Sequence, residues 1–186
     1  MDAARRDRIH ATLWPPASPS AARPLGVWAV LDGARDPRMH VALIESRLEY
    51  RCLFAGVRSR ELEMASPQLV ELLPGHRFTT RLIDEGWGQS WGIFMRIDDP
   101  ANLRPHLRTI LRVQDESGKK MLFRYYDPRV LRVYLPTCTP DELRQVFGPV
   151  DSIVIEGDGG AELLDYRRRN GLLHRSVVPV PETTSA

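Results

Sequence analysis

The segment Val27–Leu31 reads Val-Trp-Ala-Val-Leu, an unbroken apolar run that ends at Asp32-Gly33. A half-exposed strand or an amphipathic helix would interrupt such a run with polar residues, so this pattern indicates a strand buried on both faces. Asp32 and Gly33 are typical of the turn that follows a strand. The run therefore predicts the start of a layered domain in which both sides of a sheet are covered.

The rest of the chain alternates between patterns typical of strands and of helices. Three dipeptides, Asp36-Pro37, Asp127-Pro128 and Thr139-Pro140, combine a capping side chain with a proline in the first helical position. We expect strands over 27–31, 50–55, 68–73, 91–97, 120–126, 150–156 and 161–166, and helices over 37–47, 78–85, 103–111, 128–135 and 140–147. This alternation predicts an α/β (α+β) single domain with a mixed β-sheet flanked by helices and a C-terminal β-hairpin turning at 157–160.

The two ends of the chain differ from this body. Residues 1–25 predict a short N-terminal helix followed by a Pro-rich linker, because prolines at 15, 16, 19 and 24 fix an extended backbone. The folded domain is expected over 26–175. The remaining residues, 176–186, are rich in Pro, Thr and Ser and are expected to form a disordered tail.

Composition excludes several classes of function. The 26 basic and 24 acidic residues give a net charge of +2, whereas a nucleic-acid-binding domain usually carries a strong basic excess. No apolar run approaches the roughly 20 residues of a membrane-spanning helix, and the N-terminus lacks a secretory signal. Cys52 and Cys138 show neither a metal-ligand spacing nor a disulfide framework. We therefore expect a cytoplasmic protein with no cofactor, no metal, no nucleic-acid partner and no membrane insertion.

One short motif suggests catalysis. Gly88-Gln89-Ser90-Trp91-Gly92 fits the G-x-S-x-G nucleophile elbow, and His174 follows in the order that hydrolases use. The elbow places its serine between a strand and a following helix. Here a helix is expected before Ser90 and a strand after it, so a structural turn is the favoured interpretation. A small serine hydrolase using Ser90 with His174 remains the alternative.

Arginine and aromatic residues are the candidates for contact with a partner. Arg104, Arg108 and Arg112 recur every four residues beside the apolar face of the expected helix 103–111. Alternation along strand 120–126 places Arg124 and Tyr126 on the face opposite Phe123, and we expect them to be exposed. Such a surface suits a protein partner or a nucleic acid. The balanced charge of the chain favours the protein.

Five segments, in this order, resemble a known family. They are Leu31-Asp32-Gly33-Ala34, Ser66-Pro67-Gln68-Leu69-Val70, Trp91-Gly92-Ile93-Phe94, His106-Leu107-Arg108 and Phe123-Arg124-Tyr125-Tyr126-Asp127-Pro128-Arg129-Val130-Leu131. As an ordered set they are similar to the DUF4123 domain, found in adaptor chaperones of the bacterial type VI secretion system. The resemblance spans about residues 27 to 150, and the last segment is its most specific part.

The resemblance implies a role in binding and not in catalysis. Members of this family bind the N-terminal region of a cognate effector protein and help to load it onto the VgrG spike protein. We therefore expect an adaptor that is not an enzyme and whose partners are an effector and the spike. The residues expected to contact these partners are Arg104, Arg108, Arg112, Arg124, Tyr126 and Arg129.

Overall fold

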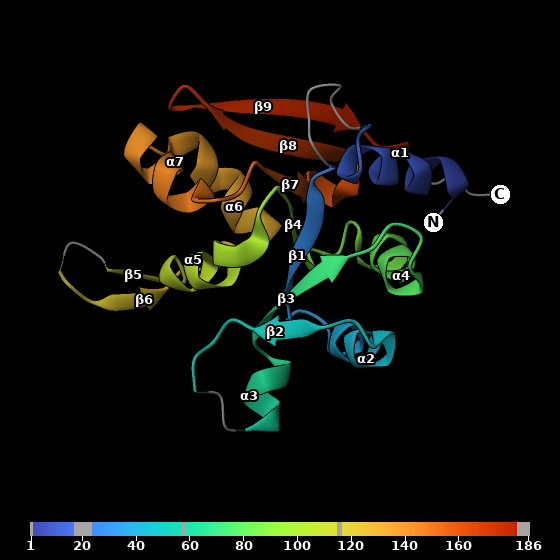
Figure 1. The fold of residues 1–186 in the computed structure, drawn as a ribbon, viewed down its shortest axis with the longest axis horizontal. Helices are drawn as coiled ribbons and strands as arrows, with labels where there is room; N and C mark the ends of the chain where they lie inside the picture. The colour runs from blue at the N-terminus through green and yellow to red at the C-terminus, as the bar shows by residue number, and fades with distance from the viewer. Residues whose placement is uncertain (1, 17–23, 57–58, 115–116, 182–186) are drawn as a thin grey trace.

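A seven-stranded sheet forms the centre of the molecule (Figure 1). The computed structural model describes residues 2–16, 24–56, 59–114 and 117–181. The strands of the sheet are β1 (Gly26–Asp32), β2 (Tyr50–Cys52), β3 (Pro67–Leu72), β4 (Gly92–Ile97), β7 (Ser152–Glu156), β8 (Glu162–Arg169) and β9 (Leu172–Pro179), in the spatial order β2-β3-β1-β4-β7-β8-β9. A separate ribbon pairs β5 (Arg112–Gln114) with β6 (Lys120–Leu122).

All described strand pairs are antiparallel, so the expectation of a mixed sheet was wrong. Two connections, from β1 to β2 and from β3 to β4, do lead to a strand of the same direction, but the strands they join are not neighbours. Strands β3 and β4 run parallel to each other with the antiparallel strand β1 between them. Strand β1 is likewise separated from β2 by β3. Each crossover therefore spans an intervening strand, which a pattern of alternating elements does not reveal.

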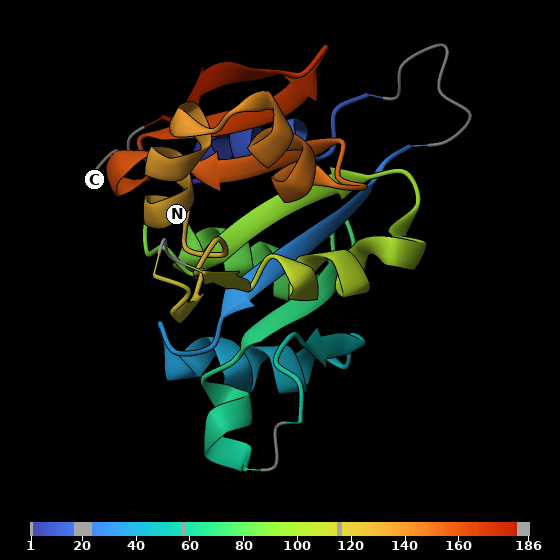
Figure 2. The same ribbon diagram turned by 90° about the vertical axis from the view of Figure 1, so that its left-hand side faces the viewer.

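Helices cover both faces of the sheet, as the buried run in β1 predicts (Figures 1 and 2). One face carries α1 (Ala3–Leu13), α2 (Pro37–Ser46) and α4 (Arg77–Gly86), and the other carries α5 (Leu103–Thr109), α6 (Pro128–Tyr134) and α7 (Pro140–Phe147). Alternate residues of β1 enter the two layers: Val30 packs with α5 to α7, whereas Ala29 and Leu31 pack with α1, α2 and α4. This confirms an α+β domain with two apolar layers.

The expected capping residues begin three of these helices. Asp36, Asp127 and Thr139 each accept a hydrogen bond from the first turn of α2, α6 or α7, and Thr139 forms a complete capping box with Glu142. The short helix α3 (Arg60–Met64), capped by Ser59, was not anticipated. Single 3-10 turns occur at η1 (Pro100–Asn102), η2 (Leu135–Thr137) and η3 (Asp158–Gly160).

The expected N-terminal helix forms as α1 and packs against the body of the fold. Ile9 and Leu13 are fully buried against the layer that contains α2 and α4. Arg6 on the polar side of α1 forms an ion pair of 2.7 Å with Asp84 of α4. Residues 17–23, which include part of the expected linker, lie outside the described residues.

The C-terminal hairpin is longer than expected. The β7–β8 hairpin forms as predicted around 157–160, but β8 then pairs with a further strand, β9, over its whole length. Strand β9 extends to Pro179, so the expectation of a disordered tail from residue 176 was wrong at its first residues. The β-branched residues Val177 and Val178 favour this strand. Residues 182–186 lie outside the described part of the chain.

Candidate partner-binding site

The expected arginine stripe is split between two elements. Arg104 and Arg108 lie on α5, but this helix ends at Thr109, and Arg112 is the first residue of β5. A single helical face therefore does not carry all three arginines, as the sequence pattern suggested. The side chain of Arg104 instead reaches the end of β2, where it donates a hydrogen bond of 3.1 Å to the carbonyl of Cys52. Its role in the structure is to connect α5 with the sheet.

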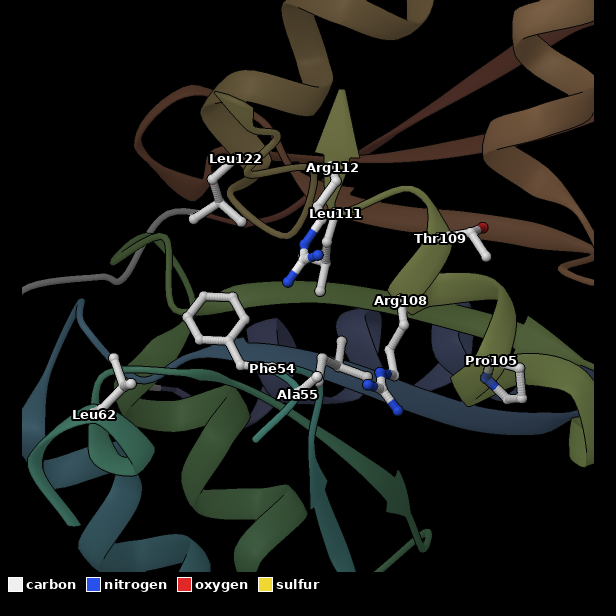
Figure 3. Close-up of a pocket in the computed structure, with 10 residues that line it drawn as sticks. Phe54, Ala55, Leu62, Pro105, Arg108, Thr109, Leu111, Arg112 and Leu122 are labelled. Atoms are coloured by element: carbon white, nitrogen blue, oxygen red, sulfur yellow. The ribbon is translucent and has the colours of Figure 1, made fainter. Parts of the chain in front are cut away.

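An open groove of about 530 Å³ lies beside α5, between this helix and the loop that follows β2 (Figure 3). Its walls come from α5, α3, the β5–β6 ribbon and the residues after β2. The lining residues are Leu53, Phe54, Ala55, Leu62, Pro105, Arg108, Thr109, Leu111, Arg112 and Leu122. Most of these are apolar, and Leu62 and Leu122 are each 49% exposed. Contiguous exposed apolar side chains of this kind mark interaction surfaces.

The charge in the described part of this groove comes from arginine. Among its described lining residues only Arg108 and Arg112 carry a charge; the Arg112 guanidinium lies above Phe54, and the Arg108 guanidinium lies beside Ala55 (Figure 3). Neither guanidinium forms an ion pair or a hydrogen bond within the described residues. The groove thus presents an apolar floor and two cations that are available to a partner.

Arg124, Tyr126 and Arg129, the other residues expected to contact a partner, lie together near the ends of β1 and β7. Arg124 forms an ion pair with Asp32, the last residue of β1, whose side chain is 1% exposed. Partial burial alone would lower the pKa of the Arg124 guanidinium, but the Asp32 carboxylate raises it. The guanidinium carbon also lies 5.8 Å from the centre of the Tyr126 ring. Arg124 therefore uses its charge to neutralise a buried acid, while part of its side chain stays exposed.

Tyr126 is buried, contrary to the expectation of an exposed contact residue. Strand β6 ends at Leu122, so the alternation that we extended to residue 126 stops four residues earlier. Tyr125 and Tyr126 are 1% and 2% exposed and pack together in an edge-on arrangement of their rings. Burial raises the pKa of the Tyr126 hydroxyl to about 12. Tyr126 is therefore a core residue.

Arg129 supports the start of α6. Asp127 caps this helix, and Arg129 donates to both of its carboxylate oxygens, with distances of 2.9 Å from Nε and 2.6 Å from the terminal nitrogen. Burial alone would raise the pKa of Asp127, but the hydrogen bonds from the side chain and backbone of Arg129 lower it. The exposed fraction of the Arg129 side chain is 49%, so it can still contact a partner.

Close packing explains two glycines of the quoted segments. A Cβ atom on Gly33 would lie 2.0 Å from the carbonyl oxygen of Met64, and one on Gly92 would lie 2.2 Å from that of Val30. The backbone N–H of Asp32 donates 2.7 Å to the carbonyl of Trp91, which brings these two segments together. The segments that lie far apart in the sequence thus meet at one end of the sheet.

The geometry around Ser90 does not form a nucleophile elbow. The residue lies in the turn between α4 and β4, with a positive φ of 57°, so a helix precedes it and a strand follows. Its hydroxyl donates to Glu156 at 3.2 Å. Glu156 pairs with Leu163 of β8. His174 of β9 pairs with Arg167, which lies four residues further along β8. The structure does not bring Ser90 and His174 together.

Metal ligands and cysteines are the remaining candidates for chemistry among the described residues. No group of three His, Cys, Asp or Glu side chains there is arranged to hold a metal ion. Cys52 and Cys138 are free thiols. No helix in the described ranges is both long and apolar enough to cross a membrane.

Comparison with known proteins identifies the family. The family model described as "Domain of unknown function (DUF4123)" matches residues 27–145, which is more than half of the chain. The chain belongs to the DUF4123 family. All residues that line the groove fall within the match, whereas α1, β8 and β9 of this DUF4123 protein lie outside it. No curated protein and no solved structure matches the chain.

Sequence reasoning missed the apolar part of the DUF4123 groove. Phe54, Leu62 and Leu122 come from three separate elements, and only the fold brings them together. One signal was available: Leu62 stands among the charged residues 60, 61 and 63, so this segment offers little apolar surface to bury in the core. Of the six residues expected to contact a partner, Arg108 and Arg112 line the groove, whereas Tyr126 is buried.

Proposed function

We propose that this DUF4123 protein is an adaptor that binds a client effector of the type VI secretion system in the cytoplasm and delivers it to the VgrG spike. Family membership supports the proposal, because the resemblance carried by the five quoted segments is to such adaptors. The mechanism is stoichiometric binding without turnover. The adaptor holds a segment of the client until the spike receives it.

The observation that carries the proposal is the groove beside α5. An apolar floor formed around Phe54 and Ala55, with Arg108 and Arg112 next to it, provides both buried area and charge for recognition of a protein. A binding surface of this composition suits a protein client better than a nucleic acid, which selects for a continuous basic surface.

The test is recovery of partners from the native bacterium. A tagged copy of the chain is isolated from cells that express the secretion system, and co-purifying proteins are identified by mass spectrometry. We expect one large effector and the VgrG spike protein. Recovery of neither protein, from cells shown to produce both, overturns the adaptor function.

Two controls separate the competing functions. Ser90→Ala is expected to recover the same partners, because its hydroxyl contacts Glu156 within the protein. Loss of an esterase activity in this variant would instead support a hydrolase. Retention on DNA that weakens steeply with salt, together with no protein partner, would support nucleic-acid binding.

A further inference from the structure

The groove beside α5 has features that define its occupant as well as its location. Eight of its ten described lining residues lie on α3, on α5 or in connecting segments, and Arg112 and Leu122 come from the β5–β6 ribbon. The lining therefore consists mainly of side chains from helices and connecting segments. Side-chain-lined grooves receive the apolar face of a helix, whereas addition of a strand requires an open edge.

The charges select which helix fits. Arg108 and Arg112 are the charged residues of the described lining, and neither has an acidic partner within the described residues. A helix that enters beside them removes water from two guanidinium groups, which is favourable only if it supplies carboxylates. Lysine or arginine at the same places on the helix would be repelled.

We propose that this groove binds an amphipathic acidic helix of the partner protein, with leucine-like residues on Phe54, Leu62 and Leu122 and glutamate or aspartate beside Arg108 and Arg112. The inference rests on the proposed adaptor function and names the segment that the adaptor recognises. The apolar contacts supply most of the buried area. The two arginines set the orientation of the helix and reject basic segments.

A pair of synthetic peptides tests the occupant directly. Both peptides have about 18 residues, with leucines at i, i+3, i+4 and i+7, and the flanking charged positions are glutamate in one and lysine in the other. Binding of each labelled peptide to the full chain is measured by fluorescence anisotropy. We expect the glutamate peptide to bind at least about tenfold more tightly than the lysine peptide. Equal binding of the two peptides, or no binding of the glutamate peptide, overturns the proposal.

Charge reversal identifies the site. The double variant Arg108→Glu with Arg112→Glu is expected to invert the preference, so that the lysine peptide binds more tightly. The matched control reverses Arg168 and Arg169, two exposed arginines on β8 outside the groove, and should leave the preference unchanged. Inversion by both double variants, or by neither, overturns the assignment to this groove.

The apolar wall has its own matched pair of variants. Leu122→Glu places a charge in the groove, and Val133→Glu places one on α6 at a side chain that is 70% exposed. Because Leu122 is itself 49% exposed, both variants are expected to keep the thermal midpoint of the wild type. Only Leu122→Glu should weaken binding of the glutamate peptide, by about tenfold or more. Equal weakening by both variants contradicts the proposal.

Recovery from cells separates failure of this inference from failure of the proposed function. If wild-type protein and the Leu122→Glu variant recover the same effector equally well, the chain is an adaptor but this groove is not its client site. If wild-type protein recovers no effector, the adaptor function fails, whatever the peptides do. Loss of the effector in Leu122→Glu but not in Val133→Glu supports both.

Discussion

The carboxylate of Glu156 accepts hydrogen bonds from both the backbone N–H and the hydroxyl of Ser90, at 2.8 Å and 3.2 Å. It also accepts from the N–H of Gly88 at 2.6 Å, so the end of β7 is joined to the turn between α4 and β4. Burial raises the pKa of Glu156, although these hydrogen bonds act in the opposite direction. The glycine-serine motif therefore has a structural explanation, because its backbone donors satisfy a buried acid.

This raised pKa predicts a dependence of stability on pH. A folded-state pKa above the unfolded-state value means that the folded protein holds a proton that the unfolded chain releases, so stability falls as pH rises above about 4.5. Glu156→Gln should remove this fall and should cost about 1–3 kcal/mol, because an amide offers fewer acceptors to the two N–H groups. Urea unfolding at several pH values measures both effects.

The control for this variant is Glu49→Gln. Glu49 is exposed and, among the described residues, forms its ion pair with the exposed Arg51, so its substitution should change neither the stability nor the pH profile. A Glu156→Gln protein whose stability still falls with pH as in the wild type would show that another group is responsible.

Asp127 predicts the opposite dependence. Its folded-state pKa is lowered despite burial, so its contribution is present above the ordinary value of 3.8 and is lost as pH falls through the folded-state pKa. Asp127→Asn keeps a capping side chain but loses the paired hydrogen bonds with Arg129. We expect the free energy of unfolding to fall by about 1 kcal/mol at neutral pH. As the pH is lowered, the variant should lose less stability than the wild type does.

Unfolding of Asp127→Asn at neutral and acidic pH tests this. Asp141→Asn serves as the comparison, because Asp141 forms an exposed ion pair with Arg144 on α7. If both variants lose the same stability and show the same acid profile, the bidentate contact at the start of α6 has no special role.

Local patterns predicted much of the fold, because they depend on neighbouring residues. The run Val27–Leu31 forms the buried strand β1, and Asp127 caps α6 as the Asp-Pro pair indicates. Tyr126 shows where this reasoning stops. Alternation along 120–126 assumes a regular strand, but β6 ends at Leu122, and the following aromatic residues turn into the core. Tertiary packing therefore overrode a local periodicity.

The site itself depended on contacts between distant segments. The sequence spacing of Arg108 and Arg112 did indicate a basic surface, but the apolar floor beneath them comes from Phe54, more than 50 residues earlier in the chain. The antiparallel order of the sheet, which places β3 and β4 on either side of β1, determines which loops meet. Pattern analysis of one sequence does not contain that information.

A buried ion pair on the α1 side of the sheet predicts a large effect of a single substitution. Arg96 is 2% exposed, forms an ion pair with Asp165, and donates from Nε to Ser152 at 2.6 Å. Arg96→Ala leaves the Asp165 carboxylate buried without this partner and should cost about 3–5 kcal/mol. Removing both charges, in Arg96→Met with Asp165→Leu, should cost less than the single variant.

Chemical denaturation of Arg96→Met, of Asp165→Leu and of the double variant gives the coupling between the two residues. Arg144→Ala, which breaks an exposed pair on α7, should change stability by less than about 1 kcal/mol. If the stability lost in the double variant equals the sum of the losses in the two single variants, Arg96 and Asp165 are not a coupled pair.

The packing of α1 leads to the final prediction, that residues 1–16 are required for stability. Ile9 and Leu13 are fully buried, and the carbonyl of Thr12 accepts a hydrogen bond of 3.0 Å from Arg96. Deleting the helix exposes apolar core and removes an acceptor from a buried guanidinium, so we expect a loss of roughly 3–6 kcal/mol from the two side chains alone.

Because the truncated protein can fail to fold, Ile9→Ala in the full chain provides the second measurement, with an expected cost of about 2–5 kcal/mol. Arg8→Ala on the exposed side of α1 is the control. A denaturation midpoint for Ile9→Ala equal to that of Arg8→Ala would mean that the packing of α1 does not stabilise the protein.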